Sequence, residues 1–338
     1  MRTSVIRRGR WALGLLMACV LILGGVGNIF QAIATRSDIE KYPAPGKLID
    51  MGGYRLHLHC MGVGSPTVIL DAAADMMSAD WGWIQPEVAA VTRVCAYDRA
   101  GMGWSDSGPY PRDAHEISVE LHALLTRSGV TGSYVLVGHS AGALYARVFA
   151  AQHPDDVVGM VLIDPGHPDM PDRIPSLQAQ MRKDARLTEM MRLLCYVGVP
   201  RLLGIGGANA QGLPPQQAAE VSASTVTPRH WATICALIAA TPASYEQARS
   251  ARISRTRPLV VISANTAWSG SGAVADETRR RVNQLHAELA AFSTNSRHCI
   301  VEEATHASLV HDRRQARTAV AAIRAVLTAA RTGQPLSL

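Results

Sequence analysis

Residues 134–146 read YVLVGHSAGALYA, an apolar run followed by the pentapeptide Gly138-His139-Ser140-Ala141-Gly142. The apolar run 134–137 predicts a central, buried strand of a parallel sheet, and residues 141–152 predict a helix. In a G-x-S-x-G turn between a strand and a helix, the glycines avoid side-chain clashes and the serine hydroxyl points away from the sheet. The helix N-terminus adds amide donors for a developing oxyanion. The pattern therefore predicts that Ser140 is a nucleophile.

Short β-rich runs alternate with helical segments on both sides of this motif. Strands are expected at 48–50, 54–60, 67–70, 91–97, 134–137, 157–163, 259–263 and 299–302, and helices at 114–128, 141–152, 275–292 and 313–330. This alternation predicts the α/β class, with a mostly parallel eight-stranded sheet covered by helices on both faces.

The alternation stops over residues 166–256, which are rich in Ala, Leu, Met, Gln and Arg and predict several amphipathic helices. A helical insertion between two strands is typical of a lid over an active site, and structural padding is the alternative. The expected core therefore has two parts, residues 47–165 and 257–332. Several apolar residues of the insertion are expected to cover a hydrophobic pocket or to pack the insertion onto the core: Leu187, Met190, Met191, Leu193 and Leu194.

The first residues predict a membrane segment. Four arginines within residues 1–10 precede the apolar stretch 11–34, which is long enough to cross a bilayer as a helix. The positive charges predict that residues 1–10 stay in the cytoplasm and that the rest of the chain is exported. A signal peptide cleaved after Ala32-Ile33-Ala34 is the alternative. Residues 35–46, with two prolines and a glycine, are expected to form a linker.

The composition of the 338 residues indicates a chain with a sizeable core, because 48% are hydrophobic and 18% are charged. These values exclude a disordered or low-complexity protein. The net charge is only +6 and includes the N-terminal arginines, so a nucleic-acid partner is not expected.

Export would place the cysteines in an oxidising compartment, where thiols can pair. Outside the apolar segment, which holds Cys19, five remain, so at least one is unpaired or pairs between chains: Cys60, Cys95, Cys195, Cys235 and Cys299. Cys195 and Cys235 are the candidate pair because both fall in the insertion. Buried free thiols are an equal alternative.

Two segments carry a resemblance to a known family. Residues 94–106 (VCAYDRAGMGWSD) resemble the loop after the fourth strand of many α/β-hydrolases, and residues 134–146 resemble their nucleophile turn. The chain is similar to this family over about residues 46–332, in particular to bacterial membrane-anchored members. In the first segment we expect structural roles for Asp98, Arg99, Gly101 and Gly103.

The resemblance implies a triad in the chain order Ser, acid, His. His306 follows the last expected strand and precedes the last helix, so it is the candidate base. His311 is the fallback, and we otherwise expect it to be a solvated histidine.

The acid departs from the usual family pattern, which places it just after the seventh strand. Residues 263–268 (SANTAW) contain no carboxylate there. Asp164, after the sixth strand, matches the position that haloalkane dehalogenases with a sixth-strand acid use, and it is our candidate to orient the histidine. Asp169 and Asp276 are the alternatives.

The expected oxyanion donors are the amides of Ala141, just after the nucleophile, and of Ala73, in the loop 71–75 after the third strand. His139 is expected to point away from Ser140. His57 and His59 share one face of a strand, but no third ligand lies at suitable spacing, so no metal site is expected.

These residues predict a serine hydrolase that cleaves a small or medium hydrophobic ester through an acyl-enzyme, without a cofactor. A serine nucleophile argues against the dehalogenase and epoxide-hydrolase branches that the fold resembles, because those use aspartate. Amide, thioester or lactone hydrolysis and acyl transfer are alternatives on the same triad. A membrane-tethered binding protein that has kept the fold without catalysis is a second class of function. The sequence gives neither the substrate nor the oligomeric state.

Overall fold

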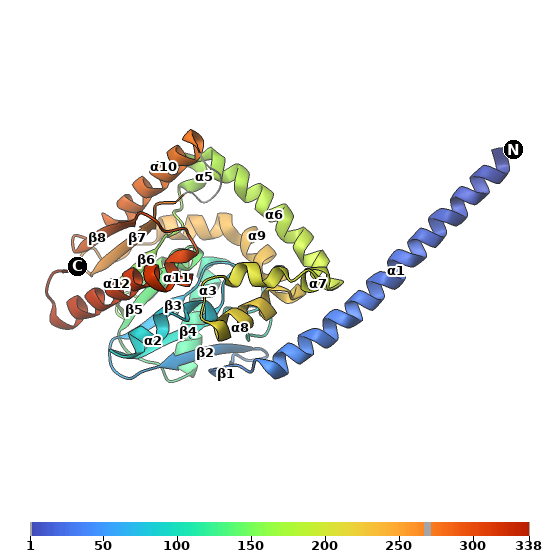
Figure 1. The fold of residues 1–338 in the computed structure, drawn as a ribbon. Coiled ribbons are helices and arrows are strands. Elements are labelled where there is room, and N and C mark those ends of the chain that lie inside the picture. Colours follow the sequence, from blue (N-terminus) through green and yellow to red (C-terminus); the bar gives the residue numbers. More distant parts are fainter. Residues whose placement is uncertain (1, 267–271, 338) are drawn as a thin grey trace.

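One eight-stranded sheet forms the centre of the protein, with strands in the order β1-β2-β4-β3-β5-β6-β7-β8. The computed structural model describes residues 2–266 and 272–337 (Figure 1). The pairs β1–β2 and β2–β4 are antiparallel and every other pair is parallel, which confirms the predicted α/β class. The strands are β1 (Lys47–Asp50), β2 (Arg55–Met61), β3 (Thr67–Asp71), β4 (Val94–Tyr97), β5 (Tyr134–His139), β6 (Val157–Ile163), β7 (Leu259–Ala264) and β8 (Ser296–Val301).

Helices cover both faces of the sheet because the central strands carry apolar side chains on both sides. On β5, Val135 and Val137 pack against one helical layer, whereas Tyr134 and Leu136 pack against the other. The first layer consists of α2 (Ile84–Ala89) and α12 (Arg313–Thr332), and the second of α3 (Ala114–Arg127), α4 (Ala141–Gln152) and α10 (Ala273–Ala290). This double burial explains the continuous apolar strands of the sequence.

Two predicted strands start three residues away from the observed ones. β4 begins at Val94 rather than at Val91, because the amides of Val91 and Thr92 still bond back to Val88 at the end of α2. β8 begins at Ser296, three residues before the predicted start, because Leu259 and the following residues of β7 pair with it from there.

The segment between β6 and β7 forms only helices, as predicted for residues 166–256. These are α5 (Met170–Arg173), α6 (Pro175–Tyr196), α7 (Val199–Leu202), η2 (Ile205–Ala210), α8 (Pro215–Thr225) and α9 (Pro228–Ser250). α8 packs on η1 (Ser78–Trp81), which follows β3, and α9 packs on α3 and α4. The insertion therefore lies beside the edge of the sheet at which the parallel strands end.

The apolar residues of α6 do not pack as expected. Only Leu177, Thr188 and Cys195 are buried in this helix. Leu187, Met190 and Leu193 were candidates for a pocket or for packing on the core, but they are about half exposed. The prediction is wrong for these three because α6 contacts the rest of the insertion through one narrow face only.

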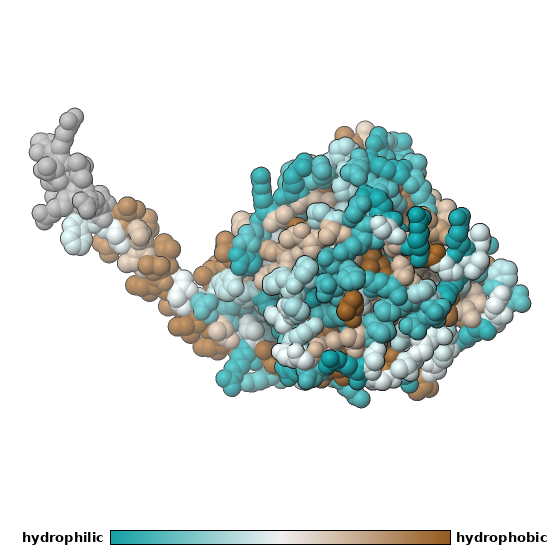
Figure 2. Space-filling view, turned by 180° about the vertical axis from the view of Figure 1, so that it is seen from behind, coloured by the Kyte–Doolittle hydropathy of each residue, from teal (hydrophilic) through white to brown (hydrophobic). Residues whose placement is uncertain are grey.

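The first helix, α1 (Arg2–Lys41), extends beyond the predicted segment 11–34 and includes most of the predicted linker 35–46. It continues because no glycine or proline lies between Gln31 and Lys41, and it ends where Pro43 disfavours a helical conformation at the preceding residue. Only residues 42–46 remain as a linker. α1 is long and apolar enough to cross a membrane, and it leaves the body of the protein as an exposed, largely apolar rod (Figure 1 and Figure 2).

The disulfide differs from the predicted pair. Cys60 on β2 and Cys95 on β4 are directly opposite each other in the antiparallel ladder and form a disulfide bond. Cys195 is a buried thiol, and the thiol of Cys235 donates a hydrogen bond to Glu189 (3.3 Å). The expectation of a Cys195–Cys235 bond is therefore wrong, because the pairing depends on the register of two strands, which the spacing of cysteines does not contain.

Peptide mapping of the non-reduced protein should recover Cys60 and Cys95 in one linked fragment. Replacing both by serine should lower the free energy of unfolding by about 3–5 kcal/mol, because the bond closes a loop between residues 35 positions apart. Cys235→Ser, the control, should change it by no more than about 0.5 kcal/mol. A linked Cys195–Cys235 fragment would contradict the structure.

Candidate active site

Ser140 forms the turn between β5 and α4. Its backbone has φ 56° and ψ −117°, a conformation that costs a residue other than glycine about 1–3 kcal/mol. The flanking glycines permit the turn: a Cβ at Gly138 would overlap the backbone of Ala143, and a Cβ at Gly142 would overlap the carbonyl oxygen of Asp71. The predicted strand–turn–helix geometry is confirmed, and the loop after β3 lies directly against it.

A buried arginine holds the loop of residues 71–75 in place. Arg99 Nη1 donates to Asp71 Oδ1 (2.6 Å) and to the carbonyl oxygen of Ala72 (2.8 Å), and Nη2 donates to the carbonyl oxygen of Ala73. Burial raises the pKa of Asp71 to about 6, although the charge of Arg99 opposes this shift. The amides of Ala73 and Ala141 donate no hydrogen bond to another of the described residues, so both can bind a substrate oxygen.

Asp164 lies at the end of β6, next to the turn that carries Ser140. The amide of Ser140 donates to the carbonyl oxygen of Ile163 (3.0 Å), so the two segments are joined through the backbone. Asp164 Oδ2 is 2.6 Å from Nδ1 of His306, and Oδ1 accepts a hydrogen bond from the amide of Ala264 (3.0 Å). The structure therefore brings the predicted acid and the predicted base into contact beside the predicted nucleophile.

The Asp164 carboxyl group is fully buried, yet its surroundings favour the charged form. Burial alone would raise its pKa. The hydrogen bond and charge of His306, the nearby His286 and the Ala264 amide outweigh burial and lower the pKa of Asp164 to about 2. A carboxylate in this state can stabilise a protonated His306.

The two alternative acids have other partners. Asp169 pairs with Arg249 (2.9 Å), and Asp276 pairs with Arg279 on the same helix (3.3 Å). The family more often has its acid in the segment that corresponds to residues 263–268. The structure describes this segment only as far as Thr266. Of the three candidates, Asp164 is the one for which the structure has a contact with His306.

His306 lies in the loop between β8 and α11 (Ser308–His311), and its side chain is 27% exposed. The amide of Thr266 after β7 donates to the carbonyl oxygen of Ala304 (2.9 Å), which fixes this loop to its neighbour. His139 Nε2 donates to the carbonyl oxygen of His306 (3.1 Å), and the two rings lie 4.6 Å apart. The side chain of His139 therefore supports the candidate base, which the sequence did not predict.

His311 is buried, in contrast to the solvated histidine that we expected. Its Nε2 lies 2.8 Å from Asp80 Oδ1, and Asp80 Oδ2 accepts a hydrogen bond from the amide of Met77 (2.7 Å). The pair joins the loop after β8 to η1, so His311 has a structural role and a contact that only the folded chain reveals.

A second buried histidine lies behind Asp164. His286 Nε2 is 2.8 Å from the carbonyl oxygen of Pro165, so Nε2 carries the proton and Nδ1 accepts from Ser263 Oγ (2.8 Å). Ser263 Oγ in turn accepts from His298 Nε2 (2.7 Å). Burial lowers the pKa of His286 to about 4, so the ring is neutral at neutral pH. These residues fix the wall behind the acid, and no sequence motif marks them.

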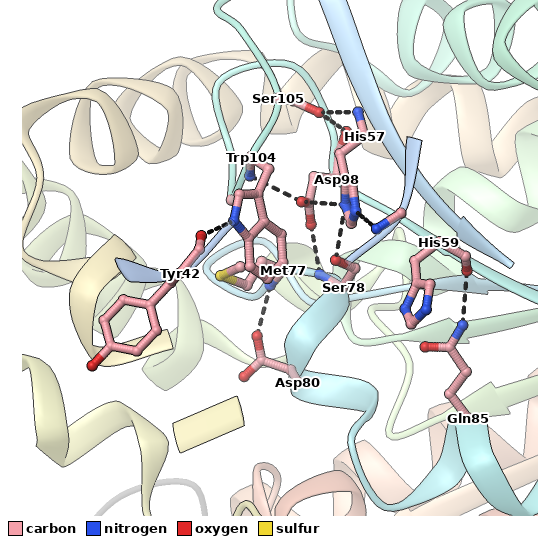
Figure 3. A network of polar contacts seen from close by, with 12 residues as sticks. Tyr42, His57, His59, Met77, Ser78, Asp80, Gln85, Asp98, Trp104 and Ser105 are labelled. Atoms are coloured by element: carbon pink, nitrogen blue, oxygen red, sulfur yellow. Dashed lines mark hydrogen bonds and ion pairs between the residues drawn. The ribbon is translucent and has the colours of Figure 1, made fainter. Parts of the chain in front are cut away.

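His57 is also buried rather than half exposed on its strand. Its Nε2 accepts a hydrogen bond from the backbone amide of Gly46 (3.1 Å). Its Nδ1 donates a hydrogen bond to Asp98 Oδ2 (2.9 Å). Asp98 also accepts the amides of Ser78 and Trp104, which ties the loops after β3 and β4 together (Figure 3). The predicted structural role of Asp98 is confirmed, and His57 belongs to that network rather than to a metal site.

A cavity of about 460 Å³ opens beside the site. Three segments form its walls. The loop after β3 contributes Asp75 and Met76, the loop that carries His306 contributes Thr305 and Ser308, and η2 contributes Ala208 and Asn209. The insertion therefore forms one wall of a space that adjoins the loop of His306, although Ser140, Asp164 and His306 themselves are not among its lining residues.

One group of possible metal ligands lies elsewhere, at His122, His153 and Asp156. The rings of His122 and His153 stack in parallel 4.0 Å apart, so their nitrogen lone pairs do not converge on one point. Ser140 and His153 flank α4 at its two ends, about 20 Å apart. This group has no part in the candidate site.

Comparison with known proteins agrees with the fold. The model of the alpha/beta hydrolase family matches residues 56–322, more than half of the chain. A thermophilic esterase from Thermogutta terrifontis superposes with a TM-score of 0.60 over 85% of this chain and 98% of that one. At 19% identity, this likeness shows the shared fold.

Curated relatives match in shorter segments. The 2-hydroxymuconate semialdehyde hydrolase of Pseudomonas sp. (strain CF600) is 31% identical over 163 residues, which are 46% of this chain and 55% of that protein. An uncharacterized protein of Schizosaccharomyces pombe is 42% identical over 83 residues, 25% of this chain and 16% of that protein. The chain thus spans less than two thirds of the length of these relatives.

Protein stability should depend on the charge of Asp164. Its pKa of about 2 lies below the ordinary 3.8, so the stabilising contribution is complete above about pH 4 and is lost as the pH falls toward 2. We expect the difference in free energy of unfolding between the natural chain and Asp164→Asn to shrink by about 2 kcal/mol over this range in urea titrations.

The matched control is Asp276→Asn, which removes an exposed carboxylate from a surface ion pair that contributes little to stability. This variant should remain close to the natural chain at every pH. A difference for Asp164→Asn that did not change between about pH 4 and pH 2 would contradict the assigned ion pair.

Proposed function

This chain belongs to the α/β hydrolase family, and on that premise we propose that it is a serine hydrolase that cleaves carboxylic esters through an acyl-enzyme. The observation that carries the proposal is the 2.6 Å contact between Asp164 and His306 beside the turn of Ser140. Nucleophilic acyl transfer needs a nucleophile, a base within reach and a group that orients the base.

The proposed reaction starts with attack of Ser140 Oγ on the ester carbonyl carbon while His306 takes the hydroxyl proton. Asp164 holds the His306 ring by Nδ1, which leaves Nε2 for the proton transfer, and stabilises the imidazolium. The amides of Ala73 and Ala141 bind the oxyanion. His306 then protonates the leaving alcohol, and a water molecule activated by the same histidine releases the acid and restores Ser140.

Three features support hydrolysis of an ester or a related acyl compound by a serine nucleophile. The backbone donors of Ala73 and Ala141 suit a tetrahedral oxyanion, and a serine rather than an aspartate stands at the turn. The set of residues supplies both nucleophile and base, so the proposed reaction needs no cofactor. We propose that residues 166–256 act as a lid, because this insertion forms one wall of the cavity next to the site.

We further propose that α1 anchors the protein in a membrane, with residues 1–10 in the cytoplasm and the hydrolase domain outside. Gln31 Nε2 donates to the carbonyl oxygen of Val226 (2.9 Å), and Asp38 pairs with Arg201 (2.5 Å). The alternative signal-peptide cleavage after Ala34 would fall between these two contacts and remove one of them. The contacts therefore support an uncleaved anchor.

The test is hydrolysis of a series of p-nitrophenyl esters, from acetate to palmitate, by the full chain in detergent. We expect turnover that Ser140→Ala abolishes and that Asp164→Asn lowers about 10³–10⁴-fold, because the histidine loses its orienting carboxylate. Asp276→Asn should keep the natural rate, since its side chain lies on the surface of α10. Unchanged turnover in Ser140→Ala, or no turnover of any ester by the natural chain, would overturn the proposal.

A further inference from the structure

The insertion exposes several large apolar side chains on α6 and at the end of α7. We call these six residues the insertion surface: Leu187, Met190, Leu193, Tyr196, Leu202 and Leu203. The four on α6 recur every three residues, so each is a neighbour of the next on the helix surface, and the set winds half a turn around the helix from Leu187 to Tyr196. Leu202 and Leu203 are 68% and 69% exposed. Soluble proteins rarely leave such residues clustered in water without a binding partner.

The C-terminal end of α6 and α7, which carry the insertion surface, lie beside the point at which α1 leaves the body of the protein (Figure 1). Asn28 Nδ2 donates to the carbonyl oxygen of Tyr196 (3.1 Å), so α1 contacts the end of α6 directly. A Cβ on Gly27 would overlap the backbone of Val197, which shows how closely the two segments pack. Together with the bonds of Gln31, these contacts fix the insertion at one level along α1.

That level coincides with one end of the apolar part of α1. Between Trp11 and Gln31 the helix rises about 30 Å, the thickness of the hydrocarbon core of a bilayer. Gln31 is buried against the insertion, whereas the side chains from Leu13 to Ile29 are largely exposed and apolar (Figure 2). If α1 spans the membrane, the insertion surface therefore reaches its outer boundary.

The charges on α6 suit the same location. In the stretch 182–186 the exposed basic residues Arg182, Lys183 and Arg186 outnumber the one exposed acidic residue, Asp184. The exposed apolar residues follow this stretch and lie in the C-terminal half of α6, nearer to α1. Exposed basic side chains next to exposed apolar ones are typical of segments that lie in the interface of membranes with anionic lipids.

We propose that the insertion surface lies in the outer boundary of the membrane that α1 crosses, and that the site takes an ester substrate dissolved in that membrane. The second part rests on the proposed function. Leu202 and Leu203 lead directly into η2 (Ile205–Ala210), whose residues Ala208 and Asn209 line the cavity beside His306. The insertion surface and one wall of this cavity thus belong to neighbouring parts of the same segment, and we place the entry of the substrate there.

A polarity-sensitive probe tests the location without any turnover. The full chain carries Leu202→Cys, and Cys19, Cys235 and Cys299 are replaced by serine. Nitrobenzoxadiazole is attached to the introduced thiol. The labelled protein is then reconstituted in vesicles of phosphatidylcholine and phosphatidylglycerol that contain doxyl-labelled lipid. The control is Val63→Cys, which is 82% exposed in the loop between β2 and β3, at the opposite edge of the sheet.

We expect lipid quenching and a blue-shifted emission at residue 202 and neither at residue 63. Lipid quenching at residue 202 that is no stronger than at residue 63 would overturn the proposal. A blue shift of the emission that depends only on protein concentration would also overturn it, because it would identify a second copy of the chain on this surface. Because the probe reports contact with lipid, the result remains decisive even if the protein has no hydrolase activity.

The substrate part is tested with Leu202→Asp/Leu203→Asp in the same vesicles. The ratio of p-nitrophenyl palmitate to p-nitrophenyl acetate hydrolysis should fall several-fold, whereas Val63→Asp should leave this ratio unchanged. An unchanged ratio in the double variant would overturn entry of the substrate from the membrane. If the natural chain does not hydrolyse p-nitrophenyl acetate, the proposed hydrolase function fails instead. The probe measurement does not depend on that function and still tests the location.

Discussion

The site depends above all on the buried contact between Asp164 and His306. A carboxylate removed from water is costly unless it is paired and hydrogen-bonded, and Asp164 meets this need with His306 and the Ala264 amide. β6 lies between β5 and β7 in the sheet, so a side chain at its end is next to the Ser140 turn on one side and to β7 on the other. An acid after β6 can therefore reach the same histidine as an acid after β7.

Supporting contacts converge on the two loops that carry the candidate triad. Arg99 holds the carbonyl oxygens of Ala72 and Ala73, which leaves the amide of Ala73 available for an oxyanion. His139 and the Asp80–His311 pair fix the loop of His306 from two further sides. Each of these contacts joins loops that follow different strands, so the geometry of the site is a property of the whole carboxyl edge of the sheet.

The sequence predicts the features that are local. The apolar run before Ser140 and the two flanking glycines determine the turn, and both are visible as a pattern. The Cys60–Cys95 bond and the burial of His57 could not be predicted, because both depend on which residues face each other across strands distant in the chain. The exposure of Leu187, Met190 and Leu193 could not be predicted either, because a sequence pattern does not show whether another element covers a given part of a helix.

The central claim is that Ser140 is the nucleophile of a working triad. The most direct measurement is reaction of the full chain with a fluorophosphonate, followed by mass mapping of the modified peptide. The account predicts one adduct, on Ser140, whose rate of formation drops in Asp164→Asn. Ser78, which lies near His57 and Asp98 in the buried network, should remain unmodified. No adduct, or an adduct on Ser78 or another serine, would contradict the account.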